Sequence, residues 1–410
     1  MMAVVNAGEL VTCSGPSESD LSKLGIIEDG ALLSKGGKVA WVGTTKDFRR
    51  KVFSKPKKPV DAEGGLVAPG LVDPHTHLIF AGSREDELER KARGETYTSI
   101  LQSGGGILRT ISETRASSIR RIVEESLERI GQLGRGGVTT VEVKTGYGGT
   151  LKEEAKLLGV IEAIRRKSPV ELVPTFLGLH ATPPGFSRTE YVEYAVREML
   201  PAIARLRTRP EFSDCFCETG VFSREDCSRY LRASRELGFS TKIHADEFSD
   251  SGGASLAAET KCTSADHLGY CSREGMEKLG AGGVMAVLLP TTSLNSGARF
   301  ADARALVRAG CAVALGTDLS PNSWVESPQV VMGLACSSLH MTPAEALLGF
   351  TANAARALRR SDIGSLGVGC NADLVVYSFP RHQFLPYRIG GRYAKYVFKR
   401  GGLAYPAPTA

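Results

Sequence analysis

Short runs of β-branched and aliphatic residues alternate with polar, helix-periodic segments through the middle of the chain. Before the second run, apolar residues recur at positions 119, 122, 123, 127, 130 and 133, along one face of a helix. This alternation predicts an α/β fold with parallel strands, and eight repeats favour a closed (β/α)8 TIM barrel over an open sheet. The expected strands are 66–78, Val138–Lys144, Glu171–His180, Asp214–Phe222, Ser240–His244, Thr263–His267, Val284–Leu289 and Cys311–Asp318.

The two ends of the chain have a different pattern. Residues 1 to 66 hold short β-type runs separated by glycine and charged residues, with little helical periodicity. Residues 373–379 and 393–398 repeat this style. We expect residues 1–66 and 370–410 to form one small composite β-sandwich domain, with the barrel, residues 67–369, inserted between them.

Composition narrows the class of protein. The 410 residues exceed the roughly 250 of one barrel, which leaves room for a second unit. A dispersed net charge of +6 does not favour nucleic-acid binding, and no apolar run approaches the ~20 residues of a membrane helix. The N-terminus lacks a secretion signal, and the nine cysteines show no repeated CxxC spacing. A reduced, cytoplasmic enzyme that binds neither nucleic acid nor membrane is expected.

Two histidines close the first expected strand, in the sequence Val72-Asp-Pro-His75-Thr-His77. Side chains alternate between the faces of a strand, so His75 and His77 point to the same side, about 7 Å apart along the strand. Two imidazoles on one face can converge on one metal ion. The alternative is that His75 and His77 are simply polar residues on the solvent-exposed face of a strand. The positions of the other histidines decide between a metal site and this alternative.

Most of the remaining histidines also fall at the carboxyl ends of expected strands. His180, His244 and His267 end the third, fifth and sixth strands, and Asp318 ends the eighth. In a barrel these ends form one rim, which carries the active site. Three imidazoles and one carboxylate suit Zn²⁺ or Fe²⁺ and leave a position for water. The predicted metal ligands are His75, His77, His244 and Asp318.

A metal of this kind lowers the pKa of a bound water toward about 7, so hydrolysis at a carbonyl or amidine carbon is the expected chemistry. Proton transfer then needs acids and bases near the water. His267, Glu247 and the free oxygen of Asp318 are the candidates, and the sequence does not choose between them. Glu247 follows His244 by three residues, so a charge at a helix N-terminus is its alternative role.

Arg84 and Tyr147 suggest what the ligand looks like. Arg84 follows the histidine pair closely, and a guanidinium at the rim can hold a carboxylate through two parallel hydrogen bonds. The alternative for Arg84 is a surface ion pair with Glu85 or Asp86. Tyr147 lies just beyond the second expected strand, at the same rim. The glycines at 104–106 lack the strand–helix context of a dinucleotide-binding loop.

Nine short sequences form a recognisable set. They are VDPHTH (72–77), AGSRE (81–85), GGGI (104–107), KTGYG (144–148), FCETGVFS (216–223), KIHADEF (242–248), SADHL (264–268), LLPTT (288–292) and GTD (316–318). Together they resemble the amidohydrolase superfamily and, within it, the imidazolonepropionase family of histidine degradation. HxH alone is typical of the whole superfamily, whereas HADEF with AGSRE and KTGYG is far more specific. The C-terminal sequence FLPYRIGGRYAKYVFKRG is also similar to that family's closing segment.

The resemblance implies a hydrolase that converts 4-imidazolone-5-propanoate, a small molecule with a carboxylate tail, to N-formimidoyl-L-glutamate. It implies a homodimer with one Zn²⁺ or Fe²⁺/Fe³⁺ per subunit, held by the four ligands predicted above. It places His267 beside the attacking water. The substrate contacts that it implies are Arg84, Tyr97, Tyr147, His180 and Glu247.

The loop after the eighth strand departs from the family pattern. The family usually has Asp-x-Asn-Pro, whereas this chain has Asp318-Leu-Ser320-Pro. Ser320 is shorter than asparagine and lacks its amide, so we expect the hold on one product carboxylate to differ, but not the type of reaction. The substrate contacts expected in this loop are Ser320, Asn322 and Ser323.

Three other functions are weighed against this one. A purine or cytosine deaminase of the same superfamily would share the metal set, but its substrate lacks a carboxylate for Arg84. A barrel that serves only as a scaffold would not need intact metal ligands. A two-metal hydrolase with a carbamylated lysine is disfavoured because residues 214–222 contain no lysine.

Overall fold

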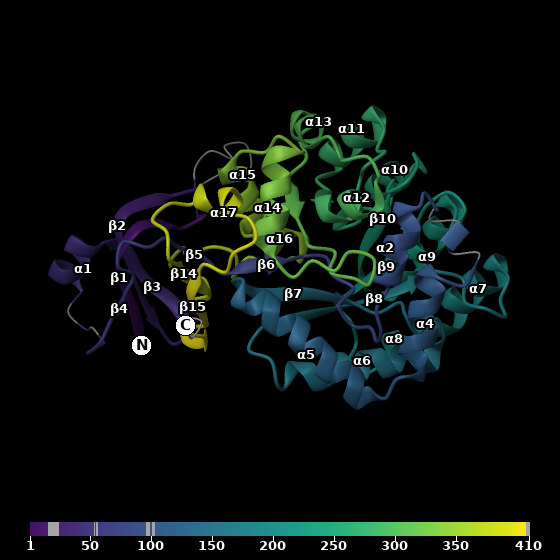
Figure 1. Cartoon of the computed structure of the whole chain (residues 1–410), viewed down its shortest axis with the longest axis horizontal. Helices are drawn as coiled ribbons and strands as arrows, with labels where there is room; N and C mark the ends of the chain where they lie inside the picture. The colour runs from purple at the N-terminus through teal and green to yellow at the C-terminus, as the bar shows by residue number, and fades with distance from the viewer. Residues whose placement is uncertain (15–23, 53, 55, 96–98, 101–102, 407–410) are drawn as a thin grey trace.

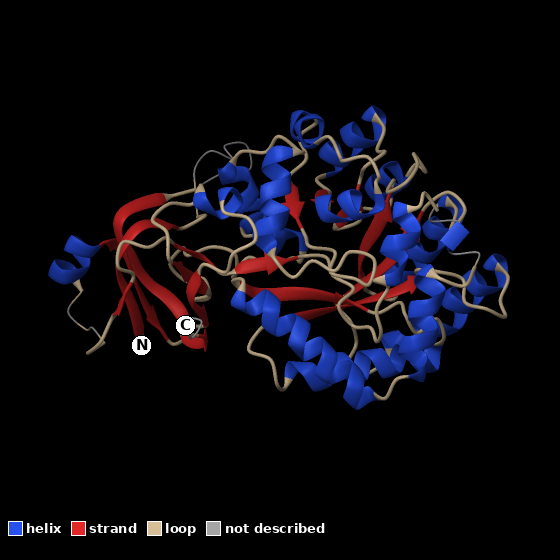
Figure 2. Cartoon of the chain, in the orientation of Figure 1, coloured by secondary structure: helices blue, strands red, loops and turns tan. Residues whose placement is uncertain are grey.

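A unit of strands surrounded by helices lies beside a smaller β unit in the computed structural model (Figure 1; Figure 2). In Figure 1 the smaller unit combines purple N-terminal strands with yellow C-terminal strands, so the two ends of the chain lie together. No helix in the described part of the chain has the length and apolar character needed to cross a bilayer. The structure describes residues 1–14, 24–52, 54, 56–95, 99–100 and 103–406.

The larger unit is built on eight strands that neighbour one another in sequence order, and every neighbouring pair is parallel. A further parallel bridge joins Thr76, after the first strand, to Leu319, after the last, and so brings the sheet edges together. The predicted (β/α)8 barrel is confirmed. Its strands are β6 (Leu71–Asp73), β7 (Val138–Lys144), β8 (Glu171–Leu179), β9 (Phe212–Cys217), β10 (Ser240–Ala245), β11 (Ser264–His267), β12 (Met285–Leu288) and β13 (Val313–Leu315).

Helices cover the outside of this sheet, so the strands are buried on both faces, as a parallel sheet requires (Figure 2). The helices of the barrel are α2 (Asp86–Ala92), α4 (Gly106–Ala116), α5 (Ile119–Arg135), α6 (Leu151–Arg165), α7 (Arg188–Tyr194), α8 (Leu200–Ala204), α9 (Arg224–Glu236), α10 (Gly253–Glu259), α11 (Arg273–Gly282), α12 (Pro290–Ser296), α13 (Ala303–Arg308), α14 (Pro328–Ser337), α15 (Pro343–Gly349) and α16 (Ala352–Ala357). A π-helical turn, Ala195–Met199, joins α7 to α8.

Helix α5 shows how the sequence sets these elements. The Ser118 side chain accepts a hydrogen bond from the backbone N–H of Arg121 and so caps the first turn. Ile122, Ile130 and Leu133 are buried along one face, at the spacing that predicted this helix. Because α5 packs this face against the barrel, its stability comes from burial more than from helix propensity.

Strands from both ends of the chain form the second sheet, in the order β16-β15-β14-β5-β1-β2-β3, with β4 paired to β1. Val4, Val67 and Leu374 are buried in one core there, although the sequence separates them widely. The composite β domain is therefore confirmed as one mixed sheet. Its elements are β1 (Met2–Val11), β2 (Ile26–Lys35), β3 (Lys38–Thr44), α1 (Thr45–Lys51), β4 (Val60–Asp61), β5 (Val67–Pro69), β14 (Leu374–Tyr377), β15 (Ala394–Lys399) and β16 (Gly402–Tyr405), and α17 (Phe384–Tyr387) lies between β14 and β15.

The single strand expected at 66–78 was wrong, because the chain changes sheets within it. Val67–Pro69 pairs with β1 and β14, whereas Leu71–Asp73 pairs with β7. Between them, Gly70 passes so close to Thr139 that a Cβ would lie 2.3 Å from its Oγ1. A continuous apolar run does not show which sheet each part joins. The domain division at residues 66 and 369 stays a proposal, and these pairings put the first crossing at Gly70.

Candidate metal centre and active site

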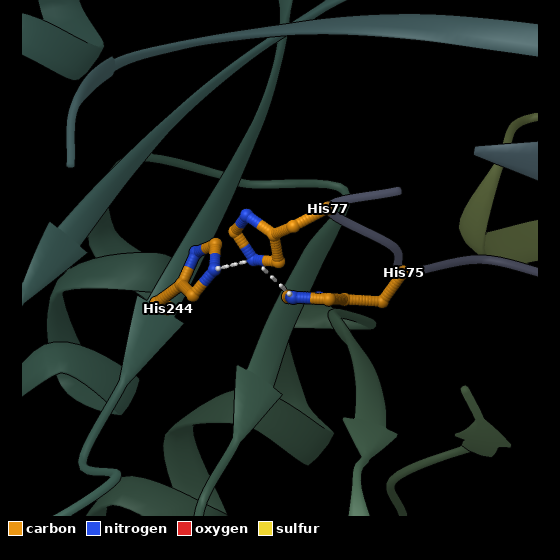
Figure 3. Close-up of side chains that lie close together, drawn as sticks. All are labelled: His75, His77 and His244. Carbon is orange, nitrogen blue, oxygen red and sulfur yellow. Dashed lines mark hydrogen bonds between the residues drawn. The ribbon is translucent and has the colours of Figure 1, made fainter. Parts of the chain in front are cut away.

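Three histidine rings converge at the carboxyl-terminal rim of the barrel (Figure 3). His77 Nε2 lies 3.3 Å from His75 Nε2 and 3.1 Å from His244 Nε2. His244 lies in β10, while His75 and His77 follow β6, which ends at Asp73. The bridge at Thr76 keeps this segment extended, so both rings turn to the same side, as their spacing predicts.

Asp318 brings a carboxylate to the same point from the end of β13. Its Oδ1 lies 3.5 Å from Nε2 of both His75 and His77. Its backbone has a φ of 49°, a left-handed conformation that non-glycine residues adopt mostly at turns and functional sites. Thr292 donates a hydrogen bond to Asp318 Oδ2 at 2.5 Å, which leaves Oδ1 for another partner. Burial raises the pKa of Asp318 to about 6, against the effect of this hydrogen bond.

Carboxylates behind the rings fix the tautomers of two histidines. His75 Nδ1 lies 2.6 Å from Asp266 Oδ2, and His244 Nδ1 lies 3.3 Å from Asp214 Oδ1. An ionised carboxylate only accepts, so each Nδ1 carries the hydrogen and each Nε2 presents a lone pair. Burial, and then the positive charge of Lys144, lower the pKa of His75 well below its usual value, which keeps this ring neutral.

These donors fit a metal ion. His75 and His244 both turn an Nε2 lone pair toward His77 Nε2, and a cation among these three nitrogens would be attracted by the lone pairs. Asp318 Oδ1 is buried and has no hydrogen-bond partner among the described residues, as expected of a carboxylate oxygen that binds a cation. Three imidazole nitrogens within 4.8 Å of one another, together with one carboxylate, suit a four-ligand site.

A fully buried network of charges lies behind the histidines, and the sequence patterns did not predict it. Lys144 donates to Glu142 Oε1 at 2.8 Å and to Asp214 Oδ2 at 2.7 Å, while Lys242 Nζ lies 3.4 Å from Asp266 Oδ2. Burial alone would raise the pKa of Asp214, but Lys144 and His244 hold this pKa well below its usual range. Glu142 and Lys144, two charged residues at alternate positions of an otherwise β-branched strand, were the sequence feature that could have indicated this network.

A cavity of about 240 Å³ opens in front of the histidines. Ser323 does not line it; this residue is fully buried, and its Oγ accepts a hydrogen bond from Asn295. Tyr97 lies outside the described residues. Apolar residues that sequence reasoning missed, such as Leu108, Phe216 and Val221, form part of the wall. The predicted residues on the wall are His77, Arg84, Tyr147, His180, His244, Glu247, His267, Asp318, Ser320 and Asn322.

Glu247 and His267 form an acid–base pair on this wall, with 3.6 Å between Glu247 Oε2 and His267 Nε2. Burial, and then the carboxylates of Asp318 and Glu218, raise the pKa of Glu247 well above its usual value. Burial is also the main cause that lowers the pKa of His267 far below its usual value. Burial therefore favours the protonated form of Glu247 and the neutral form of the His267 ring.

The alternative role for Glu247, a charge at a helix N-terminus, belongs to its neighbour Asp246. The Asp246 carboxylate accepts hydrogen bonds from the backbone N–H groups of Gly253 and Ala254, at the start of α10, at 2.9 and 3.0 Å. The Glu247 side chain lines the cavity instead. Asp246 therefore caps the helix, and Glu247 faces the cavity, a distinction that sequence spacing alone could not make.

Arg84 is buried on the cavity wall, with 8% of its surface exposed, so it is not part of a surface ion pair with Glu85 or Asp86. Its Nε and Nη2 donate to Glu87 Oε2 at 2.9 and 2.6 Å. The other oxygen of Glu87 accepts from the backbone N–H of Gly106 at 2.7 Å, at the start of α4. Glu87 therefore fixes one edge of the guanidinium, and Nη1 is not used by this pair.

Known proteins are similar in sequence to this chain over most of its length. The amidohydrolase family model matches residues 83–405. The chain is 44% identical over 405 residues to the imidazolonepropionase of Parabacteroides distasonis, which covers 97% of each chain. It is 45% identical over 410 residues to that of Symbiobacterium thermophilum, covering 98% of this chain and 96% of the relative.

Solved structures share the fold. Atrazine chlorohydrolase from Arthrobacter aurescens, complexed with zinc, superposes with a TM-score of 0.77 at 18% identity and covers 99% of this chain and 96% of its own. Guanine deaminase from E. coli gives a TM-score of 0.77 at 18% identity and covers 99% of this chain and 100% of its own. The chain belongs to the amidohydrolase family and, within it, to the imidazolonepropionases.

Proposed function

We propose that this enzyme opens the ring of 4-imidazolone-5-propanoate by hydrolysis and releases N-formimidoyl-L-glutamate, a step of histidine degradation. The observation that carries this proposal is one cavity that combines the histidine cluster with the buried Arg84. The histidine cluster suits hydrolysis, and the guanidinium suits a carboxylate tail. The substrates of a purine or cytosine deaminase have no carboxylate for Arg84. The curated relatives that match over the whole chain bear the name of this activity.

The metal that we propose is one Zn²⁺ or Fe²⁺/Fe³⁺ per subunit, held by His75, His77, His244 and Asp318. When bound, it supplies Lewis acidity and lowers the pKa of a water. The tautomers imposed by Asp214 and Asp266 support this choice, because neutral imidazoles with exposed Nε2 atoms are suitable ligands. Elemental analysis of the purified protein separates zinc from iron, and we expect close to one metal per chain.

Proton transfer in the proposed reaction needs one acceptor and one donor. Water attacks the ring carbonyl carbon, and the bond between that carbon and the neighbouring ring nitrogen then breaks. His267 and Asp318 both line the cavity and are the groups that we expect to accept the proton that the water loses. Glu247, whose protonated form is favoured because burial raises its pKa, is the group that we expect to give a proton to the departing ring nitrogen. The new acid group becomes the second carboxylate of the product.

His180 and Tyr147 are the groups that we expect to orient the imidazolone ring. His180 stacks on His77 with 4.9 Å between ring centroids, and Tyr147 lies 5.2 Å from His180 on the same measure. Burial lowers the pKa of His180 to about 3, and its Nδ1 donates to the backbone oxygen of Gly146 at 3.3 Å. Its Nε2 is therefore a hydrogen-bond acceptor that suits a ring N–H.

Replacing Arg84 with alanine should lower kcat/KM about 30-fold or more, mainly by raising KM. The reason is that charge-assisted pairing with a carboxylate in a partly dry pocket contributes roughly 2–5 kcal/mol to binding. Arg84→Lys should recover only part of this, because lysine keeps the charge but loses the planar fork. Steady-state kinetics on both variants, with metal content measured in parallel, gives the result.

Glu87→Gln is the companion variant for this measurement, because it weakens the hold on Arg84 without removing the guanidinium. We expect a smaller rise in KM than for Arg84→Ala. If KM and kcat stay at wild-type values in Arg84→Ala, Arg84 does not bind the substrate carboxylate. The main physical reason for preferring imidazolone hydrolysis to a deaminase reaction would then be lost.

The proposed activity itself is tested by incubating the metal-loaded protein with 4-imidazolone-5-propanoate and following its ultraviolet absorbance. We expect the absorbance to fall and N-formimidoyl-L-glutamate to form in equal amount. Stable absorbance at full metal occupancy would contradict the proposal.

For assembly and location, we propose a homodimer in the cytoplasm. Exposed apolar residues at one hollow beside α14 and α17, namely Leu294, Tyr387 and Ile389, support a second copy as the partner. Nine free cysteines suit a reducing compartment. Light scattering should give about 88 kDa, twice the 43.8 kDa of one chain. A mass of one chain at micromolar concentration would exclude the dimer.

A further inference from the structure

The loop after β13 has a serine at position 320, where the family pattern has an asparagine. The structure brings a different amide to the same wall, because Asn322 lines the catalytic cavity together with Ser320. We propose that Asn322 supplies a hydrogen bond to a carboxylate of the ligand and that Lys91, on α2, is the positioning residue that orients it. This inference rests on the proposed function and adds to it a residue outside the cavity.

Lys91 determines which way the amide faces. Its Nζ donates to Asn322 Oδ1 at 2.9 Å. An ammonium group only donates, so the carbonyl oxygen of the amide must face Lys91 and the NH₂ group must face away from it. Asn322 Nδ2 donates to Ser296 Oγ at 3.2 Å, which uses one of its two hydrogens. The second hydrogen remains for a ligand.

Lys91 acts through Asn322, since it does not line the catalytic cavity. A second hollow of about 290 Å³ lies behind the wall, and Lys91 lines it together with Arg84 and Asn322, which border both spaces. The ammonium group is therefore separated from the substrate by the residues that it supports. Lys91 is half-buried, whereas nearby Arg93 is exposed, and half-burying an ammonium group is costly unless it is hydrogen-bonded.

One short helix thereby supports both groups that face the carboxylate. Glu87 and Lys91 are one turn apart on α2, so they lie on the same side of it. Glu87 holds Arg84, and Lys91 holds Asn322. The ammonium group of Lys91 also places a positive charge directly behind Asn322, which suits an anionic ligand.

From the other side, α12 holds the same loop. Ser296 accepts from Asn322, and Asn295 donates to Ser323 Oγ at 3.2 Å. Thr292, on the same helix, donates to Asp318. The loop that carries Asn322 is thus fixed to the predicted metal ligand, so a well-placed amide here is also well placed relative to the reacting ring.

The test is a double-mutant cycle on steady-state kinetics with 4-imidazolone-5-propanoate, using Lys91→Met, Asn322→Ala and the double variant. Methionine keeps most of the length of lysine and removes only the ammonium group. We expect Lys91→Met to raise KM about tenfold while kcat changes less than about threefold. Asn322→Ala should have a similar effect, and the double variant should be no worse than Asn322→Ala alone, because both act through one group.

Arg93→Met is the matched control, because it removes an exposed cation from the end of the same helix, where Arg93 pairs with Glu89. Its KM should equal that of the wild type. Three results would overturn the inference: an unchanged KM in Lys91→Met, effects that multiply in the double variant, or a fall in metal content that explains the loss. Absence of turnover in the metal-loaded wild type would overturn the proposed function and this inference with it.

Discussion

His244→Ala should lose most of its metal and at least a thousandfold in kcat/KM. His244 is one of three histidines whose Nε2 atoms converge, and it comes from β10, across the barrel from the other two. Removing it leaves three ligands and a gap on that side of the site. The Asp214 carboxylate, which receives the Nδ1 hydrogen of this ring, would also lose this partner and keep only Lys144 of the two described. Metal content by elemental analysis and turnover should therefore fall together.

His340→Ala is the matched control, because His340 is exposed and lies outside the histidine cluster. It should keep wild-type metal content and kinetics. The melting temperature of both apoproteins should be measured as well, so that loss of metal is separated from loss of the fold. Full metal occupancy with normal turnover in His244→Ala would remove this residue from the site.

Glu247→Gln should lower kcat by about 10²–10⁴ and leave KM within a few-fold of the wild type. Glutamine keeps the size and the polar character of the side chain but cannot pass a proton to the departing nitrogen. The buried position of Glu247, near the carboxylates of Asp318 and Glu218, raises its pKa and so favours its protonated form. The residue is therefore a suitable acid for this step, and its loss should appear in kcat.

Metal content is the internal check for this variant, because Glu247 lies outside the ligand set and its change should leave occupancy at the wild-type value. Glu274→Gln, which alters an exposed carboxylate on α11, should behave as the wild type. A kcat near that of the wild type in Glu247→Gln would move the proton donor to His267 or Asp318.

The barrel could be predicted from sequence because its strands are buried on both faces and several of them, such as β8 and β12, read as short apolar runs. The same property hid the change of sheet at Gly70, since both β5 and β6 are buried and apolar. The helical segment that follows β8 is interrupted by a π-helical turn, which periodicity alone does not predict. Pro201 has no N–H to donate, and the backbone N–H of Leu200 bonds to Ala195, five residues back, in a π-helical turn.

The histidine cluster was predictable because a barrel brings the carboxyl ends of its strands to one rim. Residues that end different strands in the sequence therefore lie close together in the structure. The partners of Arg84 and Asn322 were not predictable in this way. Glu87 and Lys91 reach them from a short helix whose placement depends on tertiary packing. Glu85, Asp86 and Glu87 all follow Arg84 within three residues, and only the three-dimensional fold selects Glu87.

The most direct test of hydrolytic ring opening is product analysis in water enriched in ¹⁸O. Metal-loaded protein is given 4-imidazolone-5-propanoate in one reaction and cytosine, guanine or adenosine in the others. We expect only the first to react, with N-formimidoyl-L-glutamate that carries one ¹⁸O in its new carboxylate and no release of ammonia. Ammonia from any of the nucleobase substrates, with the imidazolone left intact, would contradict this account.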